Sequence, residues 1–343
     1  MTDQTPSKPR IVDIALQAGV GTATVDRVLN GRPGVKPKTV QKVMEAARFL
    51  EESGGRPTVL APTPAGLKLR AFLGGSPGFA NEILAQALRE RARAAGFPLR
   101  LDFVRRTEPA ALAQALTECG MDGTSGVIVQ PVEHPLVRDA LASLIAKGVH
   151  IVTVLTQIPG IDELGYAGLD NRAAGRVTGQ ILGHLIGEQG DIAIFHSDAL
   201  YRSHEEREAG LRSILREDFP LVRIVEAAST DDNPTECLRM TQDLIARHPD
   251  ISGIVNFAGG NRGIERALLD AGRAPDITYI AFNLTPLTRK ALIERTIDAV
   301  IHQDMGRIAE TALSSLLAAH QGAPMRIVTV PAEVILRENL RDI

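Results

Sequence analysis

The stretch IVDIALQAGVGTATVDRVLNGRPGVKPKTVQKVMEAA, residues 11–47, decides the architecture of the N-terminal part of this chain. Its apolar residues recur at helical spacing, which predicts three short helices, IVDIALQA, TATVDRVLN and PKTVQKVMEAARFL. Gly19 is expected to end the first helix, because glycine adopts the left-handed conformation without penalty. Pro37 suits the first turn of the third helix. The sequence therefore predicts a three-helix head over residues 8–50.

The second of these helices has an apolar and a polar face. Its apolar stripe consists of Val25, Val28 and Leu29. The opposite face is short and polar and consists of Thr22, Ala23, Asp26 and Arg27. An α-helix fits the major groove of DNA, where an arginine can pair with guanine O6 and N7. The same helical shape also occurs without DNA, so a three-helix cap on an enzyme stays open at this point.

The stretch resembles the DNA-binding head of LacI/GalR-type transcriptional regulators. The matching positions are Asp13, Ala15, Ala18, Gly19, Val20, Thr24, Val25, Arg27, Val28, Leu29, Asn30, Val35 and Thr39. The resemblance implies a helix-turn-helix in which Thr22, Ala23 and Arg27 face base edges. It also implies phosphate contacts, which position the protein rather than specify the sequence, from Thr24, Asn30 and Thr39.

Two positions depart from the family pattern. Gly21 stands where a serine caps the second helix, and glycine is a slightly weaker cap. Asp26 replaces the serine before the arginine. We keep Asp26 among the DNA-facing residues, where its carboxylate either accepts from a cytosine amino group or steadies Arg27.

The charge of the chain is divided unevenly. The whole chain has 38 Lys and Arg against 41 Asp and Glu, a net charge of −3. Residues 8–48 alone hold eight basic and three acidic residues, a net charge of +5. A basic head on an acidic body prompts a search for a nucleic-acid partner, although many surfaces reach this value by chance.

Composition excludes several other classes of protein. Two Cys are too few for a disulfide framework, and the eight His show no metal-ligand spacing, so we expect no metal site and no cofactor. No spacing of a catalytic triad or carboxylate pair is recognisable. The N-terminus lacks the apolar core of a secretory signal, and no run of about 18 apolar residues predicts a membrane span. We therefore expect a cytoplasmic protein that does not engage a membrane.

Residues 51–66 predict a linker, because Gly54, Gly55 and Pro57 open a segment dense in glycine and proline. The family resemblance implies a hinge helix here that inserts a leucine into the minor groove. In this chain the leucine position falls on Pro64, and internal prolines are poor for a helix. Either Leu60 replaces the leucine or the segment is a plain flexible linker.

From residue 67 onward, short apolar runs alternate with amphipathic stretches, which predicts parallel βαβ units in two doubly wound lobes. This α/β body, residues 67–343, resembles the periplasmic sugar-binding-protein fold, particularly its ribose-binding branch. The matching stretches are residues 166–175, 281–283 and 303–306. The resemblance implies three chain crossings and a ligand in the cleft between the lobes. We expect lobe 1 at about 67–163 and 285–320, and lobe 2 at about 164–284 and 321–343.

The same resemblance assigns the pocket. Phe79 matches a sugar-stacking aromatic residue, Thr156 and Gln157 replace an Asp-Arg pair, and Asn283 replaces an aspartate. Glu205 stands at the first arginine of an R-x-R-x-x-G run whose later residues are Arg207 and Gly210. The candidate effector-binding residues are Phe79, Asn81, Thr156, Gln157, Arg202, Glu205, Asn261, Asn283 and Gln303. Glu205 either accepts sugar hydroxyls, pairs with a cationic effector or belongs to a solvated helix start, and Asn283 is alternatively a turn residue.

The leading interpretation is a transcriptional repressor of a carbohydrate or polyol catabolic operon. It would bind palindromic double-stranded operator DNA as a homodimer, under the control of a sugar or polyol effector. The alternatives are an activator, a solute-binding protein of a sugar transport system, and an α/β enzyme with a helical cap. We expect no enzymatic activity.

Overall fold

The computed structural model describes residues 11–18, 20–52, 67–75, 79–197, 201–230 and 232–340 of the 343-residue chain. The chain divides into two compact units, Met1–Pro62 and Thr63–Ile343, which we call the head and the body.

The head is the predicted three-helix unit. Its helices are α1 (Ile11–Ala18), α2 (Thr22–Leu29) and α3 (Pro37–Glu52). Among its described side chains, those buried in the core are Ile14, Ala15, Val25, Val43, Ala46 and Ala47.

Leu29 departs from the predicted apolar stripe of α2. Val25 is fully buried and Val28 packs at the edge of the core, whereas Leu29 is 42% exposed. Leu29 is the last residue of α2, where the other two helices no longer cover it. Helical spacing alone therefore overestimated the width of the packed face.

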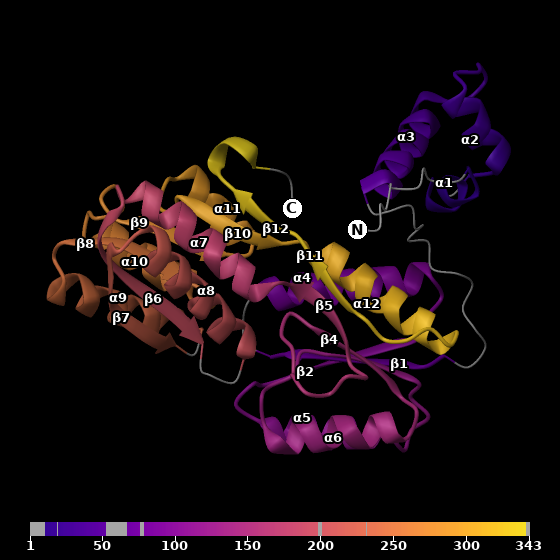
Figure 1. Cartoon of the computed structure of the whole chain (residues 1–343), viewed down its shortest axis with the longest axis horizontal. Coiled ribbons are helices and arrows are strands. Elements are labelled where there is room, and N and C mark those ends of the chain that lie inside the picture. The colour runs from indigo at the N-terminus through magenta and orange to yellow at the C-terminus, as the bar shows by residue number, and fades with distance from the viewer. Residues whose placement is uncertain are drawn as a thin grey trace. The chain divides into compact units, whose positions relative to one another are not determined.

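One lobe of the body, lobe 1, contains a six-stranded sheet with the order β11-β5-β4-β3-β1-β2, and its paired strands are parallel. The strands are β1 (Leu69–Gly74), β2 (Leu99–Val104), β3 (Gly126–Val129), β4 (His150–Val154), β5 (Gly165–Leu169) and β11 (Ile327–Val330). The helices are α4 (Phe79–Ala94), α5 (Pro109–Cys119), α6 (Pro135–Ala146) and α12 (Met305–His320). Figure 1 shows α4 and α12 on one face of the sheet and α5 and α6 on the other, as a parallel sheet requires.

Lobe 2 repeats this plan with the strand order β12-β10-β9-β8-β6-β7. The strands are β6 (Gln189–Ser197), β7 (Leu221–Thr230), β8 (Ile251–Asn256), β9 (Thr278–Phe282), β10 (Ala299–Gln303) and β12 (Ala332–Ile335). The helices are α7 (Asn171–Leu185), α8 (Arg202–Asp218), α9 (Pro234–Arg247), α10 (Asn261–Asp270), α11 (Pro286–Ile293) and the short η1 (Arg337–Asn339). β12 runs antiparallel to β10, and the other paired strands are parallel.

The chain passes between the lobes three times: between β5 and α7, between β10 and α12, and between β11 and β12. Three expected lobe assignments were wrong. β5 pairs with β4 in lobe 1, α11 and β10 continue the sheet of lobe 2, and β11 pairs with β5 in lobe 1. A β-α-β connection returns to its own sheet, which keeps α11 and β10 beside β9. The single last strand expected near residues 326–336 is divided at Pro331 into one strand for each lobe.

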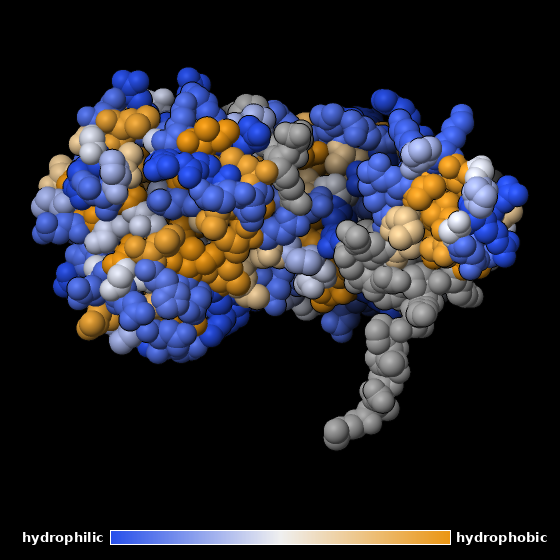
Figure 2. All heavy atoms as spheres, turned by 90° about the horizontal axis from the view of Figure 1, so that it is seen from above, coloured by the Kyte–Doolittle hydropathy of each residue, from blue (hydrophilic) through white to orange (hydrophobic). Residues whose placement is uncertain are grey.

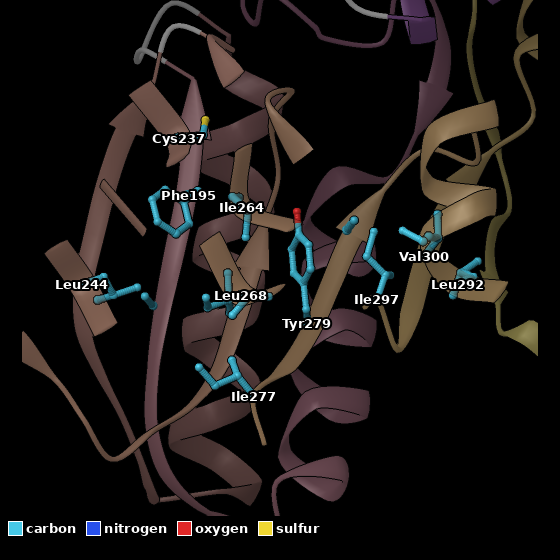
Figure 3. Packing of buried hydrophobic residues seen from close by; sticks show 14 of the residues in the cluster. Phe195, Cys237, Leu244, Ile264, Leu268, Ile277, Tyr279, Leu292, Ile297 and Val300 are labelled. Atoms are coloured by element: carbon cyan, nitrogen blue, oxygen red, sulfur yellow. The ribbon is translucent and has the colours of Figure 1, made fainter. Parts of the chain in front are cut away.

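The core of lobe 2 fills the space between its sheet and its helices (Figure 3). Fully buried side chains from three elements, Phe195 of β6, Leu268 of α10 and Tyr279 of β9, pack together in it. The Tyr279 hydroxyl donates to Asn261 Oδ1 at 2.6 Å. The core therefore reaches the first residue of α10, which faces the cleft described below.

A stripe of glycines lets α7 and α8 approach closely. Gly175, Gly179 and Gly183 repeat at i, i+4 and i+8 on the face of α7 that meets α8, and Gly210 of α8 faces α7 in return. A Cβ at Gly175 would overlap the backbone carbonyl of Arg207. The glycines thus determine where the backbone of Arg207 lies relative to α7.

In the part of the chain that the structure describes, no helix is both long and apolar enough to cross a membrane. Figure 2 shows a surface on which hydrophobic residues are grouped between hydrophilic ones.

Candidate functional site

The exposed face of α2 presents the residues expected to read base edges. Thr22, Ala23 and Arg27 are all exposed. The helix begins after Gly21, whose lack of a side chain leaves the first turn without a side-chain cap. The carbonyl of Gly21 accepts hydrogen bonds from the backbone amides of Thr24 and Val25 instead. The arrangement leaves the start of α2 open for close approach to another surface.

Asp26 is engaged within the head, but not with Arg27. Its carboxylate accepts from Asn30 Nδ2 at 2.8 Å and from Arg32 Nη1 at 3.1 Å. Asn30 Nδ2 also donates to the carbonyl of Asp26 at 2.9 Å, so both of its protons are used. Of the two roles considered for Asp26, steadying Arg27 is therefore not the one seen, and a phosphate contact from the Asn30 amide requires this cluster to rearrange.

Thr24 and Thr39, the other expected phosphate contacts, are half-buried. Thr39 lies in the first turn of α3, where its amide donates to the carbonyl of Lys36 at 2.8 Å. Their contact with DNA stays a prediction. The questions about Leu60 and Pro64, and the cap expected at Gly19, lie outside the described residues.

A cavity of about 530 Å³ lies in the body between the two lobes. Residues from lobe 1, such as Asn81 and Gln130, line it together with residues from lobe 2, such as Arg207 and Asn283. Its rim contains the starts of several helices, since the loops after parallel strands converge at one edge of each sheet. Three non-glycine residues with positive φ also lie at this cavity, Leu155, Asp232 and Asn283. Such conformations gather at functional sites.

Four expected effector residues line the cavity: Asn81, Asn261, Asn283 and Gln303. Asn81 Nδ2 donates to the carbonyl of Gly74, and Gln303 Nε2 donates to Asn283 Oδ1, both at 2.9 Å. Asn261 Oδ1 accepts from Asn256 Nδ2 at 2.7 Å as well as from Tyr279. Burial raises the pKa of the Tyr279 hydroxyl well above its usual range, so it stays a donor. Ligand contact from these four residues stays a prediction, but their side chains are held in place.

Four others lie elsewhere. Glu205 is exposed and outside the cavity, and Arg202 pairs with Glu206 at 2.9 Å. Thr156 is buried, where its hydroxyl accepts from the amide of Ser203 at 3.2 Å and joins lobe 1 to lobe 2. Gln157 lines a separate hollow of about 460 Å³ near β5 and β11.

The geometry of α8 explains why Glu205 lies outside the cavity. Ser203, His204 and Arg207 line the cavity, and they share one face of the helix. Glu205 is rotated by about 200° from Ser203 along the helix, so it points to solvent. Phe79 is the first residue of α4, and the sugar-stacking role expected of its side chain lies outside what the structure describes.

The sequence analysis did not assign the most buried of the described charged side chains that line the cavity. Arg207 is 3% exposed, donates through Nε to Asn171 Oδ1 at 2.8 Å and lies over the ring of Phe282 at 4.4 Å. Burial lowers the pKa of its guanidinium to about 10, which still leaves it charged at neutral pH. The sequence signal for it was present, because Arg207 stands three residues before Gly210 in the run that the family resemblance singles out.

A second omission is an ion pair that joins the lobes. Arg106, which follows β2 in lobe 1, donates to Asp232 Oδ2 of lobe 2 at 2.5 Å. Asp232 Oδ1 also accepts from Ser197 Oγ at 3.1 Å and from the amide of Gly259 at 2.6 Å. Arg106 is 3% exposed. No sequence motif pairs these two residues, which lie on loops far apart in the chain.

His204 completes the polar lining. Its Nδ1 accepts from the amide of Ser197 at 3.2 Å, so Nε2 carries the proton in the neutral ring. Burial, reinforced by the positive charge of Arg207, holds the pKa of His204 well below its usual range. His204 is therefore a neutral donor at physiological pH. Within the described ranges, no group of three or more His, Cys, Asp or Glu could hold a metal ion.

Comparison with known proteins finds a separate family match for the head and for the body. Residues 74–324 match the family model described as periplasmic binding protein domain, and this match covers most of the chain. The chain belongs to the periplasmic binding protein domain family. Residues 10–51 match the model of bacterial regulatory proteins of the lacI family, which covers the helices of the head.

Individual relatives fall into the same two groups. Ribose import binding protein RbsB of Salmonella typhimurium is 23% identical over 202 residues, which are 58% of this chain and 66% of that protein. The match thus spans just under two thirds of this relative. Catabolite control protein A of Priestia megaterium is 39% identical over 79 residues, 23% of each protein. An uncharacterised transcriptional regulator of Streptomyces limosus is 48% identical over 65 residues, which are 19% of this chain and 18% of that protein.

Solved structures confirm the fold of the body. A solute-binding protein from Burkholderia graminis, in complex with D-arabinose, aligns with a TM-score of 0.75 and 19% identity over 81% of this chain and 98% of that one. One from Bacillus halodurans with bound myo-inositol aligns with a TM-score of 0.74 and 18% identity over 81% and 97%. A lacI-type head on such a body supports a DNA-binding regulator over a stand-alone solute-binding protein.

Proposed function

We propose that this protein is a cytoplasmic transcriptional regulator that binds operator DNA through α2 and responds to a small hydroxylated effector in the cleft. The observation that carries the proposal is the presence, in one chain, of a lacI-type head and a body with a polar cleft between two lobes. The exposed Thr22, Ala23 and Arg27 supply the reading face. Repression of a carbohydrate or polyol operon is the form of regulation that this combination favours.

The operator is expected to be palindromic and the regulator a homodimer, because two heads on one duplex match an operator with two-fold symmetry. An effector controls DNA affinity only by the difference in its affinity for the two lobe arrangements. The interlobe contacts of Asp232 and Thr156 are the ones that a change of arrangement would make or break. We assign no enzymatic activity to the protein.

The test begins by selecting operator sequences for the full-length protein from a library of palindromic duplexes, followed by gel shifts at fixed salt. Arg27→Ala should lower affinity for the selected duplex by about 1–3 kcal/mol, while affinity for random DNA changes little. The matched control is Lys42→Ala, which removes one exposed positive charge from α3. It should weaken both duplexes to a similar extent.

Equal loss of selected and random binding in Arg27→Ala would remove α2 from sequence reading. Failure of the wild-type protein to enrich any duplex would overturn the regulatory function as a whole. A steep fall of affinity with rising salt is expected in either case if the head meets phosphates.

A further inference from the structure

The charged side chains of the cleft indicate what kind of ligand it takes. Among the described residues, the charged side chains that line it are the cations Arg207, Arg262 and Lys290 and the acid Asp232. Lys290 and Arg262 are exposed, and Lys290 lies 3.6 Å from Glu294. The least exposed charges of the cleft are therefore those of Arg207 and Asp232.

Asp232 is already neutralised by the protein. Arg106 occupies one of its carboxylate oxygens, and Ser197 and the amide of Gly259 occupy the other. A carboxylate with an ion pair and two further donors has little capacity left for ligand hydroxyls. It also contributes no uncompensated negative charge to the cavity.

Arg207 has no such partner. Among the described residues, no carboxylate lies within ion-pair distance of it, and its described hydrogen bonds go to the neutral acceptors Asn171 Oδ1 and the carbonyl of Phe257. No bond of its Nη2 is formed within the described part of the chain. Burying a charged group is costly unless it is paired. A guanidinium that is 3% exposed, lines a cavity and has no described carboxylate partner is suited to pair with an anion.

The side-chain amides of the cleft supply further hydrogen-bond donors, which also suit an anion. Oδ1 of Asn261 is occupied by Tyr279 and Asn256, and Oδ1 of Asn283 is occupied by Gln303. Each asparagine therefore keeps its Nδ2 protons for another partner. His204 Nε2 is a further donor.

One buried acceptor in the cleft lacks a hydrogen-bond donor. Gln303 is 2% exposed and lines the cavity, and its Oε1 has no hydrogen-bond partner among the described residues. A buried carbonyl oxygen without a donor is costly, and a ligand hydroxyl is the group that would satisfy it. The ligand therefore carries hydroxyl groups as well as negative charge.

We propose that the effector is a hydroxylated, monosaccharide-sized compound with one anionic group, a sugar acid, whose carboxylate pairs with Arg207. The inference rests on the proposed function, because it names the effector class of the same cleft. The hydroxyl groups meet Gln303, and the amide protons of Asn261 and Asn283 surround the oxygen atoms. A terminal phosphate ester offers the same charge, so the probes must separate the two anions.

The experiment is isothermal titration calorimetry of the full-length protein without DNA. The probes are D-ribonate and D-gluconate, the neutral D-ribose and D-glucose, and the terminal phosphate esters of the two sugars. We expect at least one aldonate to bind roughly tenfold or more tightly than its matched neutral sugar. Because no DNA is present, the result does not depend on whether the head reads an operator, and the operator selection above tests that function separately.

Two variants test whether the preference for the aldonate depends on the charge of the cleft. Arg207→Gln keeps a polar side chain but removes the charge, and it should cost roughly tenfold or more in aldonate affinity while the neutral sugar changes little. Asn283→Asp places a carboxylate in the cleft at a residue with φ of 67°, a conformation that Asp tolerates. It should also weaken the aldonate selectively. The control is Arg212→Gln, which removes a positive charge from the same helix at a residue outside the cavity that pairs with Glu208.

Tighter binding of a phosphate ester than of its aldonate would overturn the carboxylate assignment. Neutral sugars that bind as tightly as both anions would overturn the anionic class, as would an absence of binding by every anion. If Arg207→Gln does not fold, Asn283→Asp tests the same charge balance, and unchanged aldonate affinity in that variant counts against the proposal.

Discussion

The face of α2 and the cleft of the body are both polar surfaces, but they are built in opposite ways. The α2 face is one continuous segment whose expected DNA-reading side chains are exposed. The cleft assembles residues from distant segments, such as Asn81, Arg207 and Gln303, most of them held by other protein groups. A residue on an exposed helix face can be substituted with little effect on its neighbours, because few contacts hold it. A buried site transmits each change to its partners.

The largest effect that separates the two regions should come from the ion pair between the lobes. Asp232→Asn removes the carboxylate partner that holds Arg106, which is 3% exposed. Removing one partner of a buried ion pair lowers the free energy of unfolding by about 3–5 kcal/mol. Urea denaturation of the full chain, followed with a probe in the body, would measure the loss. The control is Asp243→Asn, which breaks an exposed pair with Arg239 and should cost less than about 1 kcal/mol. Equal losses in the two variants would show that the lobes do not depend on this pair.

The next effect concerns the glycine contact behind Arg207. In Gly175→Ala the new methyl group overlaps the carbonyl of Arg207, so α7 and α8 must separate. We expect a loss of about 1–3 kcal/mol in stability, together with weaker binding of the cleft ligand. Val177→Ala, on an exposed position of α7, is the control and should change both quantities little. A stable Gly175→Ala with normal ligand binding would mean that the backbone position of Arg207 does not matter.

A smaller effect should appear in the pH dependence of stability. The folded pKa of His204 lies well below its ordinary value of 6.5 because of burial and the nearby charge of Arg207. Below pH 6.5 the His204 ring is therefore protonated in the unfolded chain but stays neutral in the folded chain. The free energy of unfolding consequently falls as the pH falls. His204→Gln should reduce the decline in melting temperature between about pH 7.5 and about pH 5.5. An unchanged decline would assign the acid sensitivity to other groups.

The smallest effect should be at the end of α2. Leu29→Ala removes a side chain that is 42% exposed, so we expect the stability of the head to change by no more than about 0.5 kcal/mol. Val25→Ala, at a fully buried neighbour, should cost several times more. Thermal denaturation of the full chain, followed with a probe in the head, would compare them. A large loss in Leu29→Ala would show that this leucine has a packing partner after all.

The head could be predicted closely because its information is local. Helical spacing and Pro37 placed the three helices nearly where they lie. The misjudged exposure of Leu29 and the partners of Asp26 depend on where neighbouring helices and Arg32 end up, which spacing does not contain.

The body could be predicted in class but not in its lobe boundaries or its full site. Alternating apolar and amphipathic runs indicated two doubly wound lobes, but a strand's sheet is decided by its pairing partner. Pairing with neighbouring strands places β5 and β11 in lobe 1 and β10 in lobe 2. The family resemblance pointed to Asn81, Asn261, Asn283 and Gln303, which line the cavity, and to Glu205, which lies outside it on the exposed face of α8.

The sequence by itself determined the three helices of the head, the α/β class of the body and the separation of a basic segment from an acidic one. These properties follow from short-range periodicity and composition. Only the tertiary structure decided that Asp232 is neutralised by Arg106 and that Arg207 is buried without a described carboxylate. Burial and long-range pairing depend on how distant segments pack, and they decide which charges of the cleft remain for a ligand.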